Sequence, residues 1–244
     1  MNTTAELEAA SYATWSADES DVVGGWHVTA TAGVTRRINS ARAIGAATVD
    51  DATLHLLTDW FRGHDLPLVI RETPLMAPGT SEAVRDRWGF EALDETHIMT
   101  NATGEGGPQE VQIVPVNDRG FQYELAGLNH RSEADAATTH RIYDRVGDRS
   151  VGLWIPGKGT AVAVRDGDLA AIFAVAVSPE NRRTRIATRL MEAASAWAAK
   201  QGAQELFVQV LRTNRPAIEL YEGLGFTERY RYRYLRPQPV RGTA

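Results

Sequence analysis

The stretch from Ile172 to Met191, IFAVAVSPENRRTRIATRLM, constrains the fold more than any other part of the chain. It opens with an apolar, β-branched run of the kind that makes a buried strand, and Pro179 ends that run. Apolar residues then recur at helical spacing between Ile186 and Trp197. The pattern therefore predicts a strand that leads through a tight turn into a helix.

The predicted turn is basic, because it carries Arg182, Arg183 and Arg185. The first backbone N–H groups of a helix lack partners within the helix, and the helix dipole adds partial positive charge at the same end. Basic side chains beside such amides favour the binding of a phosphate or pyrophosphate. The sequence thus predicts an anionic ligand at this turn.

This stretch resembles the central motif of the GCN5-related N-acetyltransferase (GNAT) superfamily. In that motif a strand ending in V-x-P is followed by Q/R-x-x-G-x-G/A and by a helix that grips the pyrophosphate of acetyl-CoA. The matching positions are Val177, Pro179, Arg182, Arg185 and Ala187. Arg185 departs from the pattern, because the family usually has glycine there, a residue whose backbone approaches a phosphate closely and takes positive φ values.

A second segment, NRPAIELYEGLGF from Asn214 to Phe226, follows a predicted strand over 205–211. It resembles the family's N-x-x-A-x-x-L-Y-x-x-L-G-F segment almost position by position. The resemblance implies an enzyme that transfers an acetyl group from acetyl-CoA, as cosubstrate and without a metal, to an amine of a small molecule, peptide or protein. Two other functions stay open: a CoA-binding sensor or scaffold without catalysis, and an acyltransferase similar to mycothiol synthase.

The resemblance also implies roles for single residues. Tyr221 would protonate the departing CoA thiolate, although a packing role stays open, and Asn214 would bond the pantetheine arm. The backbone of 175–177 would offer strand-edge partners, since the family splays its two central strands. The implied cofactor-binding residues are Val175, Ala176, Val177, Arg182, Arg183, Thr184, Arg185, Ile186, Ala187, Thr188, Asn214, Ala217 and Tyr221.

The residues do not identify a general base. Glu180 lies beside the basic turn and is interpreted as a solvated or arginine-paired carboxylate. The histidines show no spacing typical of metal ligands.

Composition and charge limit the classes of partner that the protein is expected to bind. The net charge of −5 argues against a general nucleic-acid binder, and the absence of cysteine excludes disulfides and thiolate chemistry. No apolar run reaches membrane-spanning length, and the first ten residues lack the features of a secretion signal. We expect a cytoplasmic monomer or homodimer with an amine acceptor as its partner, and neither nucleic acid nor membrane.

The N-terminal half repeats the order of the C-terminal half. A predicted helix over 54–61, a strand over 66–72, a helix over 81–88 and Gly89-Phe90 follow one another as the later elements do. A repeat of this length indicates a duplicated α/β unit. With the resemblance, it predicts α/β tandem GNAT-like lobes, each a mixed, mostly antiparallel sheet flanked by helices.

The boundary between the lobes is expected in the glycine-rich stretch 101–109. Residues 1–104 would form a degenerate N-terminal lobe and residues 105–240 the catalytic domain. The first lobe is expected not to bind CoA, because Arg85 takes the place of Tyr221 and Asp50 and Asp51 stand at its helix start, where carboxylates repel a pyrophosphate.

The remaining elements follow from local patterns. A capping box, Thr3 to Glu6, predicts a helix over 4–15. Gly157-Lys158-Gly159 is interpreted as a hairpin turn rather than a phosphate loop, and Arg36 and Arg37 as a solvated part of a hairpin strand. The final strand, 227–236, alternates arginine and tyrosine, which predicts tyrosines on the core face and arginines in solvent. The other predictions are strands over 26–31, 35–44, 111–116, 150–155, 160–165 and 169–177 and a helix over 133–146.

Overall fold

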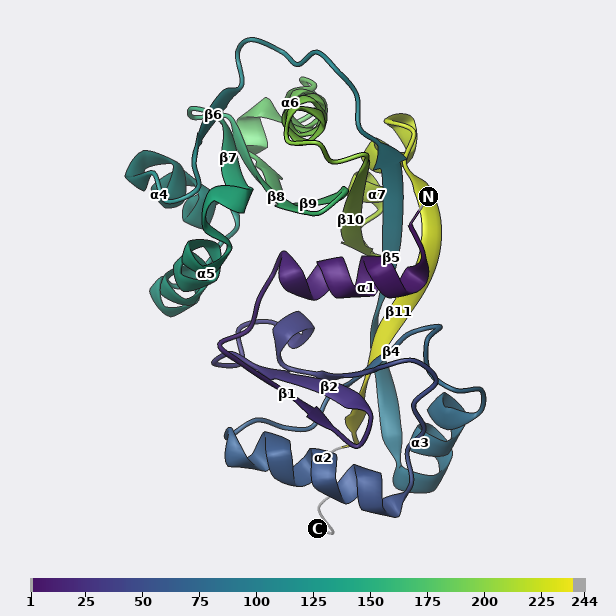
Figure 1. The fold of residues 1–244 in the computed structure, drawn as a ribbon. Coiled ribbons are helices and arrows are strands. Elements are labelled where there is room, and N and C mark those ends of the chain that lie inside the picture. Colours follow the sequence, from purple (N-terminus) through teal and green to yellow (C-terminus); the bar gives the residue numbers. More distant parts are fainter. Residues whose placement is uncertain (1, 239–244) are drawn as a thin grey trace. The chain divides into compact units, whose positions relative to one another are not determined.

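The computed structural model describes residues 2–238 and is drawn in Figure 1. Contacts between Cα atoms divide the chain into two compact units. Of the described residues, unit 1 comprises 2–16 and 98–229, and unit 2 comprises 17–97 and 230–238. The N-terminal helix thus groups with the later part of the chain, and most of the last strand groups with the earlier part. The expected division at residues 104 and 105 stays a prediction.

Unit 1 contains one mixed sheet and the helices that cover it. Its strand order is β11-β5-β10-β9-β8-β7-β6, in which β9 and β10 run parallel and β6 to β9 form an antiparallel meander. The elements are α1 (Thr4–Ala13), β6 (Gln112–Pro115), α4 (Arg119–Leu128), α5 (Glu133–Val146), β7 (Ser150–Ile155), β8 (Gly159–Asp166), β9 (Leu169–Val177), α6 (Ile186–Lys200), β10 (Glu205–Leu211), α7 (Arg215–Gly223), and parts of β5 (Phe90–Ala102) and β11 (Thr227–Pro237).

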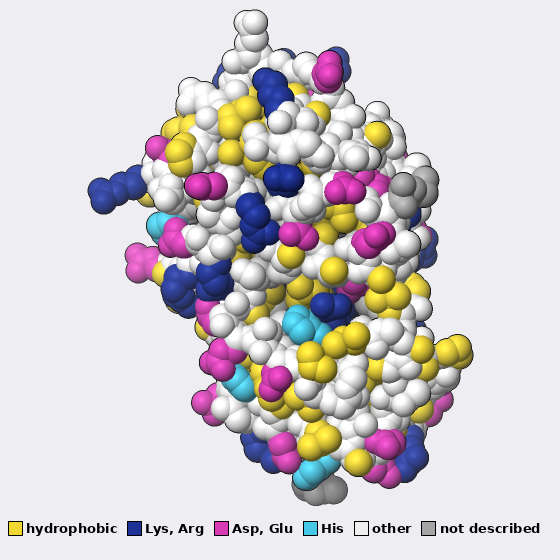
Figure 2. Space-filling model, viewed as in Figure 1, with side chains coloured by type: hydrophobic (Ala, Val, Ile, Leu, Met, Phe, Trp, Pro, Cys, Tyr) yellow, Lys and Arg dark blue, Asp and Glu magenta, His cyan; other side chains and the backbone are white. Residues whose placement is uncertain are grey.

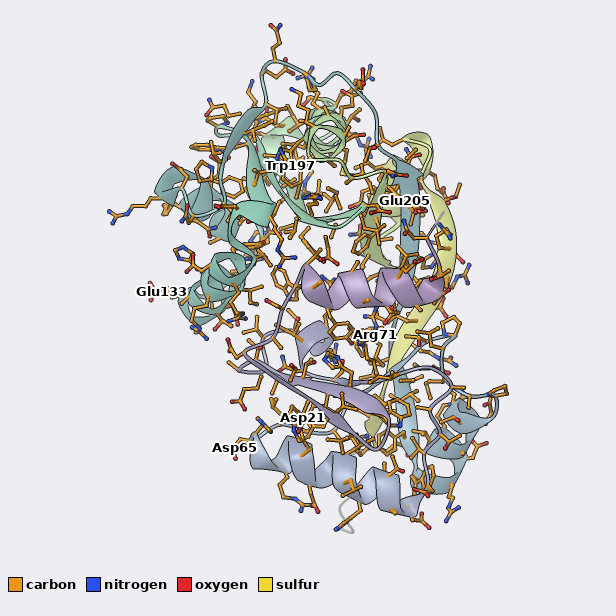
Figure 3. The ribbon with its side chains drawn as sticks, viewed as in Figure 1. Asp21, Asp65, Arg71, Glu133, Trp197 and Glu205 are labelled. Carbon is orange, nitrogen blue, oxygen red and sulfur yellow. The ribbon has the colours of Figure 1, made fainter. Side chains whose placement is uncertain are left out.

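Helix α6 supplies much of the core of unit 1. Leu190 and Trp197, the second of which is labelled in Figure 3, are buried in one cluster with residues of β7 to β10. Gly159 lets β8 approach this helix, because a Cβ there would lie 2.8 Å from Ile186 Cγ2 and 2.9 Å from the carbonyl oxygen of Ala176. The start of α6 is therefore held tightly against the ends of β8 and β9.

Unit 2 repeats this plan with shorter elements. Its strand order is β1-β2-β3-β4-β11-β5, and β3 and β4 run parallel. Trp26, Leu57, Phe61 and Ile70 are fully buried in its core. The elements are β1 (Glu19–Val23), β2 (Trp26–Ala30), β3 (Ala41–Ala43), α2 (Asp51–Gly63), β4 (Ile70–Glu72) and α3 (Thr80–Trp88), together with the other parts of β5 and β11.

The predicted duplication of an α/β unit is confirmed. The order β3-α2-β4-α3-β5 in the chain matches β9-α6-β10-α7-β11. In both copies a glycine with positive φ, Gly89 or Gly225, and a buried phenylalanine follow the second helix and lead into the last strand. In unit 2, β11 lies between β4 and β5, whereas in unit 1, β5 lies between β10 and β11. Each unit therefore contains, at the same place among its strands, the strand that ends the other copy of the repeat.

One local prediction needs correction, and two elements were not predicted. A strand, β1, precedes the tight turn at Gly24 and Gly25, both of which have positive φ, and it was not predicted because its residues alternate poorly. Arg36 and Arg37 lie in a 3-10 turn rather than a strand, and Arg36 pairs with Asp94 instead of being simply solvated. Helix α4 was also not predicted.

The last strand follows its predicted alternation only in part. Tyr230, Tyr232 and Tyr234 are buried, as expected from the period of a strand. The arginines are not all in solvent, because β11 faces acidic neighbours: Arg229 pairs with Glu205 at 2.8 Å, and Arg233 pairs with Glu72. Ion pairs therefore cover the polar face of this strand.

Two further observations concern membrane-spanning helices and surface charge. No helix within residues 2–238 is long and apolar enough to cross a membrane. On the face shown in Figure 2, basic and acidic side chains are interspersed, so this face has no single-sign field of the kind that attracts polyanions.

Candidate functional site

Strand β9 carries a β-bulge near its end. Val162 pairs with Phe173 and Thr160 pairs with Ala176, so two residues of β9, Ala174 and Val175, oppose the single residue between them on β8. Ala174 has a φ of 50°, the left-handed conformation that such a bulge uses. The bulge bends β9 away from its regular path.

The two central strands separate beyond this point. β9 and β10 pair from Leu169 with Glu205 to Ile172 with Val208, and the register continues no further. Residues 175–177 keep β8 on one side, are half-buried, and have no strand on the other side. The expected splay is present, and it leaves backbone N–H and C=O groups free to bind an extended, amide-containing chain as a strand would.

The basic turn follows directly. A 3-10 turn covers Pro179–Asn181, and Arg183 and Arg185 then take φ values of 61° and 65° before α6 begins at Ile186. Arg182, Arg183, Thr184 and Arg185 are exposed, whereas Ala187 and Thr188 are partly covered. Within the described residues, none of these arginines is engaged in an ion pair.

The first turn of α6 is left open. No side chain caps it, and it contains no acidic residue. By contrast, a side-chain oxygen accepts a hydrogen bond from the first turn of α1, α2, α4, α5 and α7. The free N–H groups of α6 and the neighbouring guanidinium groups therefore form a site suited to an anion such as a pyrophosphate.

Arg185 keeps the backbone conformation that the family's usual glycine would take. Its φ of 65° lies in the left-handed region, which costs a non-glycine residue about 1–2 kcal/mol. The departure from the motif thus changes the side chain at this position but not the path of the turn.

Tyr221 lies on α7 with only 7% of its surface exposed. Burial raises the pKa of its phenol to about 12, so the hydroxyl stays protonated at neutral pH. Its ring lies 5.7 Å from that of Phe226, centroid to centroid, and belongs to the same core cluster as Ile186. The geometry suits both a packing residue and a proton donor.

Asn214 and Ala217 form the start of α7. The Asn214 Oδ1 atom accepts a hydrogen bond from the Ala217 N–H at 3.3 Å, which caps the helix. The Nδ2 group of Asn214 takes no part in this cap and can donate to a ligand. Ala217 is half-buried and packs against the core cluster with Val175 and Val177.

Glu180 is fully exposed, as expected for a solvated carboxylate. Its own backbone N–H and Ser178 hold its pKa below the usual value. Within residues 2–238, no group of three acidic or histidine side chains is placed to hold a metal ion.

Sequence reasoning missed α4 and with it Glu124. This carboxylate accepts hydrogen bonds from the Trp154 indole at 2.9 Å and from the Gly157 N–H at 3.0 Å. The signal was present, because Asp118 is followed by apolar residues at helical spacing, among them Phe121 and Leu125, both fully buried.

The corresponding turn of unit 2 is closed. Asp50 caps α2, since its Oδ1 atom accepts a hydrogen bond from the Thr53 N–H at 2.7 Å. Asp51 pairs with Arg87 and accepts a hydrogen bond from the Trp88 indole at 2.8 Å. Carboxylates therefore occupy the start of α2, whereas the start of α6 is open.

A parallel strand pair that splays at a bulge, followed by an open, basic helix start, is the arrangement of the GNAT superfamily, and the chain belongs to it. Within the superfamily, a family model described as "Probable histone acetyltransferase Rv0428c C-terminal" matches residues 3–235. The chain is a member of that family and, by homology, an N-acetyltransferase-type protein.

Individual relatives agree with this assignment. A curated protein of Bacillus subtilis (strain 168), "Uncharacterized N-acetyltransferase YobR", is 25% identical and aligns with 93% of this chain and 96% of its own length. A GCN5-related N-acetyltransferase from Kribbella flavida shares the fold at a TM-score of 0.71, with 16% identity and coverage of 98% and 97%. A tandem GNAT protein from the clavulanic acid biosynthesis pathway has a TM-score of 0.64, 14% identity and coverage of 96% and 88%. The tandem GNAT fold is thereby confirmed.

Proposed function

We propose that the protein is an acetyl-CoA-dependent N-acetyltransferase that acts in the cytoplasm on a primary amine of a small molecule, peptide or protein. One observation carries the proposal: the unpaired edge of 175–177 leads directly into the open, basic start of α6. A pantetheine arm with its amides fits the first part, and a pyrophosphate fits the second.

In this proposal the donor lies along β9. The pyrophosphate sits on the first N–H groups of α6 with Arg182, Arg183 and Arg185 around it, and the pantetheine amides pair with the backbone of 175–177. The thioester then lies near the bulge, where β9 and β10 separate. Asn214 can donate from Nδ2 to the arm as its Oδ1 atom caps α7.

The chemical step is acyl transfer. The neutral amine attacks the thioester carbonyl carbon, a tetrahedral intermediate forms, and the C–S bond breaks as the electron pair leaves with sulfur. Tyr221 donates its proton to the departing thiolate, a role that fits a phenol kept protonated by burial. None of the residues of the proposed donor site is assigned as the acceptor of the amine's proton.

The acceptor class is supported by comparison alone. The matching family is described as a histone acetyltransferase, which favours a lysine-like amine on a peptide or protein. The small-molecule alternative stays part of the proposal, because the tandem GNAT neighbour is described as belonging to a biosynthetic pathway.

Two measurements test the function. Titration calorimetry should show acetyl-CoA binding, and a thiol-release assay should show free CoA only when a suitable amine is present. Binding without release for any amine in a broad panel would favour the CoA sensor, and release with an amino-sugar thiol precursor alone would favour the mycothiol-synthase-like activity. A purified, folded protein that does not bind acetyl-CoA would refute the proposal.

A further inference from the structure

The carboxylate of Glu124, on α4, has one oxygen that accepts hydrogen bonds and one oxygen that does not. Its Oε2 atom accepts hydrogen bonds from the Trp154 indole and the Gly157 N–H. Its Oε1 atom is buried and has no hydrogen-bond partner. Within the described residues, no arginine, lysine or histidine pairs with this side chain. A buried carboxylate oxygen without a protein partner is costly, and a water, an ion or a ligand group has to complete it.

A second buried oxygen without a partner lies on the same side of the sheet. The Oγ1 atom of Thr160 is buried and makes no hydrogen bond. Thr160 pairs with Trp154 on β7 and with Ala176 on β9. Because directly opposed residues of antiparallel strands project to the same face, Trp154, Thr160 and Ala176 form one row across three strands.

This row leads from Glu124 to the splayed part of β9. Ala176 lies just past the bulge, is half-buried, and has no β10 partner. Helix α4 packs on this face, since the Phe121 and Trp154 rings lie 6.3 Å apart, centroid to centroid. Helix α6 packs on the other face, where it contacts Gly159. Thr160, and Glu124 through Trp154, therefore belong to the row that ends at Ala176, on the face of the sheet opposite the pyrophosphate helix.

We propose that Glu124 and Thr160 form the subsite that binds the acceptor as an ammonium ion, and that Glu124 is the base that neutralises it. A carboxylate oxygen and a hydroxyl oxygen are both acceptors, and a cation compensates the uncompensated charge. In the step, an N–H bond of the ammonium breaks, its electron pair stays on nitrogen, and the proton moves to Glu124 Oε1. The resulting amine is the nucleophile, and the second proton that nitrogen loses after the C–N bond forms restores the Tyr221 phenol through solvent; this part rests on the proposed acetyl transfer.

A purely structural role for Glu124 would be to hold Trp154 and the turn between β7 and β8. Glu124→Gln separates the two roles, because a glutamine oxygen still accepts from Trp154 and Gly157 while the charge and the basic oxygen are removed. Glu192→Gln, at an exposed position of α6, is the matched control for loss of one carboxylate. Thermal unfolding should be similar for both variants and the wild type.

Binding is tested without acyl transfer by ligand-observed NMR with a panel of primary amines, each paired with the alcohol of the same shape. We expect the amines but not the alcohols to bind the wild type and Glu192→Gln, and Glu124→Gln to weaken amine binding at least tenfold. Thr160→Val should weaken it less, about threefold. Equal binding by the wild type and Glu124→Gln, or no binding of any amine to the wild type, would overturn the proposal.

Kinetics give the second readout. Glu124→Gln should lower kcat/KM for the amine at least a hundredfold, while the calorimetric Kd for acetyl-CoA stays within about twofold of the wild type. An unchanged kcat/KM in a folded variant would exclude Glu124 as the base. Failure of the wild type to bind acetyl-CoA would instead refute the proposed donor, and the NMR result would still decide the ammonium site.

Discussion

At the scale of single residues, side chains and backbone of the basic turn both contribute to the proposed anion site. The amides of α6 give direction to a bound anion, and the exposed guanidinium groups add charge that solvent partly screens. Because the turn has several donors, removal of one arginine is expected to be partly compensated by its neighbours. A change of two charges tests the site more sharply.

Replacement of Arg182 and Arg183 together by glutamate should weaken acetyl-CoA binding at least tenfold, on the order of 1.4 kcal/mol. The reason is that two attractive charges become repulsive beside the pyrophosphate. Calorimetry at fixed ionic strength measures the effect. Arg119→Glu with Lys200→Glu, the latter at the opposite end of α6, changes the net charge equally and should bind normally. Unchanged affinity in the folded Arg182/Arg183 variant would exclude the turn as the pyrophosphate site.

Tyr221→Phe should lower turnover more than it raises the apparent KM for acetyl-CoA, since the hydroxyl acts when the thiolate leaves and the ring is retained. Burial raises the Tyr221 pKa to about 12 from the ordinary value near 10, so the donor stays protonated until strongly alkaline pH. Steady-state kinetics at several pH values measure both effects. Wild-type turnover by the variant at every pH would make Tyr221 a packing residue.

The same shift affects stability. The folded protein binds the phenolic proton more tightly than the unfolded chain, so this contribution is complete below about pH 10 and is lost as pH rises towards 12. Tyr221→Phe should therefore reduce the loss of stability in that window.

At the scale of elements, the strand β8 approaches the helix α6 closely because Gly159 has no side chain. Gly159 faces Ile186 and the Ala176 carbonyl at distances that a methyl group cannot occupy without movement. The bulge of β9 and the start of α6 both lie beside this contact. The shape of the proposed donor site therefore depends on Gly159, which belongs to neither of the two family motifs.

Gly159→Ala should destabilise the protein by about 1–3 kcal/mol, because the added methyl group overpacks the contact with α6. It should also weaken acetyl-CoA binding, since the helix start must move. Gly127→Ala on α4 has free space around the new methyl group and should keep or raise stability. Denaturant unfolding and calorimetry measure both quantities. A Gly159→Ala variant as stable as the wild type would show that the contact is loose.

Elements with strong local signals were predictable from the sequence. The helix over 133–146 and the strands 150–155, 169–177 and 205–211 have the predicted bounds, because alternation, helical spacing and caps agree there. Helix α4 escaped prediction since its glycines weaken the helical pattern, and β4 is shorter than predicted since only Ile70 to Glu72 find strand partners. Pairing depends on the neighbouring strand, which a local pattern does not contain.

The candidate site was predictable to the extent that it follows a contiguous motif. The turn at 182–185 and the edge at 175–177 are local in sequence, and the structure has an uncapped helix start after the one and an open strand edge at the other. Glu124 and Thr160 are separated from that motif and from each other. The packing of α4 on the sheet places Glu124 on Trp154, and the pairing of β8 with β9 places Thr160 beside Ala176. An unpaired buried oxygen is a property of the folded chain alone.

At the scale of the whole molecule, the sequence repeat was visible but the strand arrangement was not. The spacing of helices and glycine-phenylalanine pairs reveals two copies, yet nothing in that spacing predicts that each unit includes the final strand of the other copy. Such pairing makes Phe90–Ala102 and Thr227–Pro237 part of both units. Deletion of either half of the chain would therefore remove a strand from the sheet that remains, and experiments belong on the full chain.

The last prediction concerns the number of donor sites. Both copies of the repeat contain a parallel strand pair joined by a helix, but only α6 starts with free amides and arginines, whereas α2 starts with Asp50 as its cap and Asp51 in an ion pair. A pyrophosphate at α2 would meet two carboxylates and lose the N–H groups that Asp50 already occupies. Arg85 also stands in place of Tyr221.

We therefore expect one acetyl-CoA per chain by calorimetry with a protein concentration fixed by amino-acid analysis. The double variant Arg182→Glu with Arg183→Glu should abolish this one binding event at the concentrations used, whereas Asp50→Asn with Asp51→Asn should leave the stoichiometry at one, because removing repulsion does not supply the missing arginines. Two molecules bound per wild-type chain, or a remaining event of full stoichiometry in the arginine variant that disappears when Asp51→Arg is added, would show that the first copy is a working donor site.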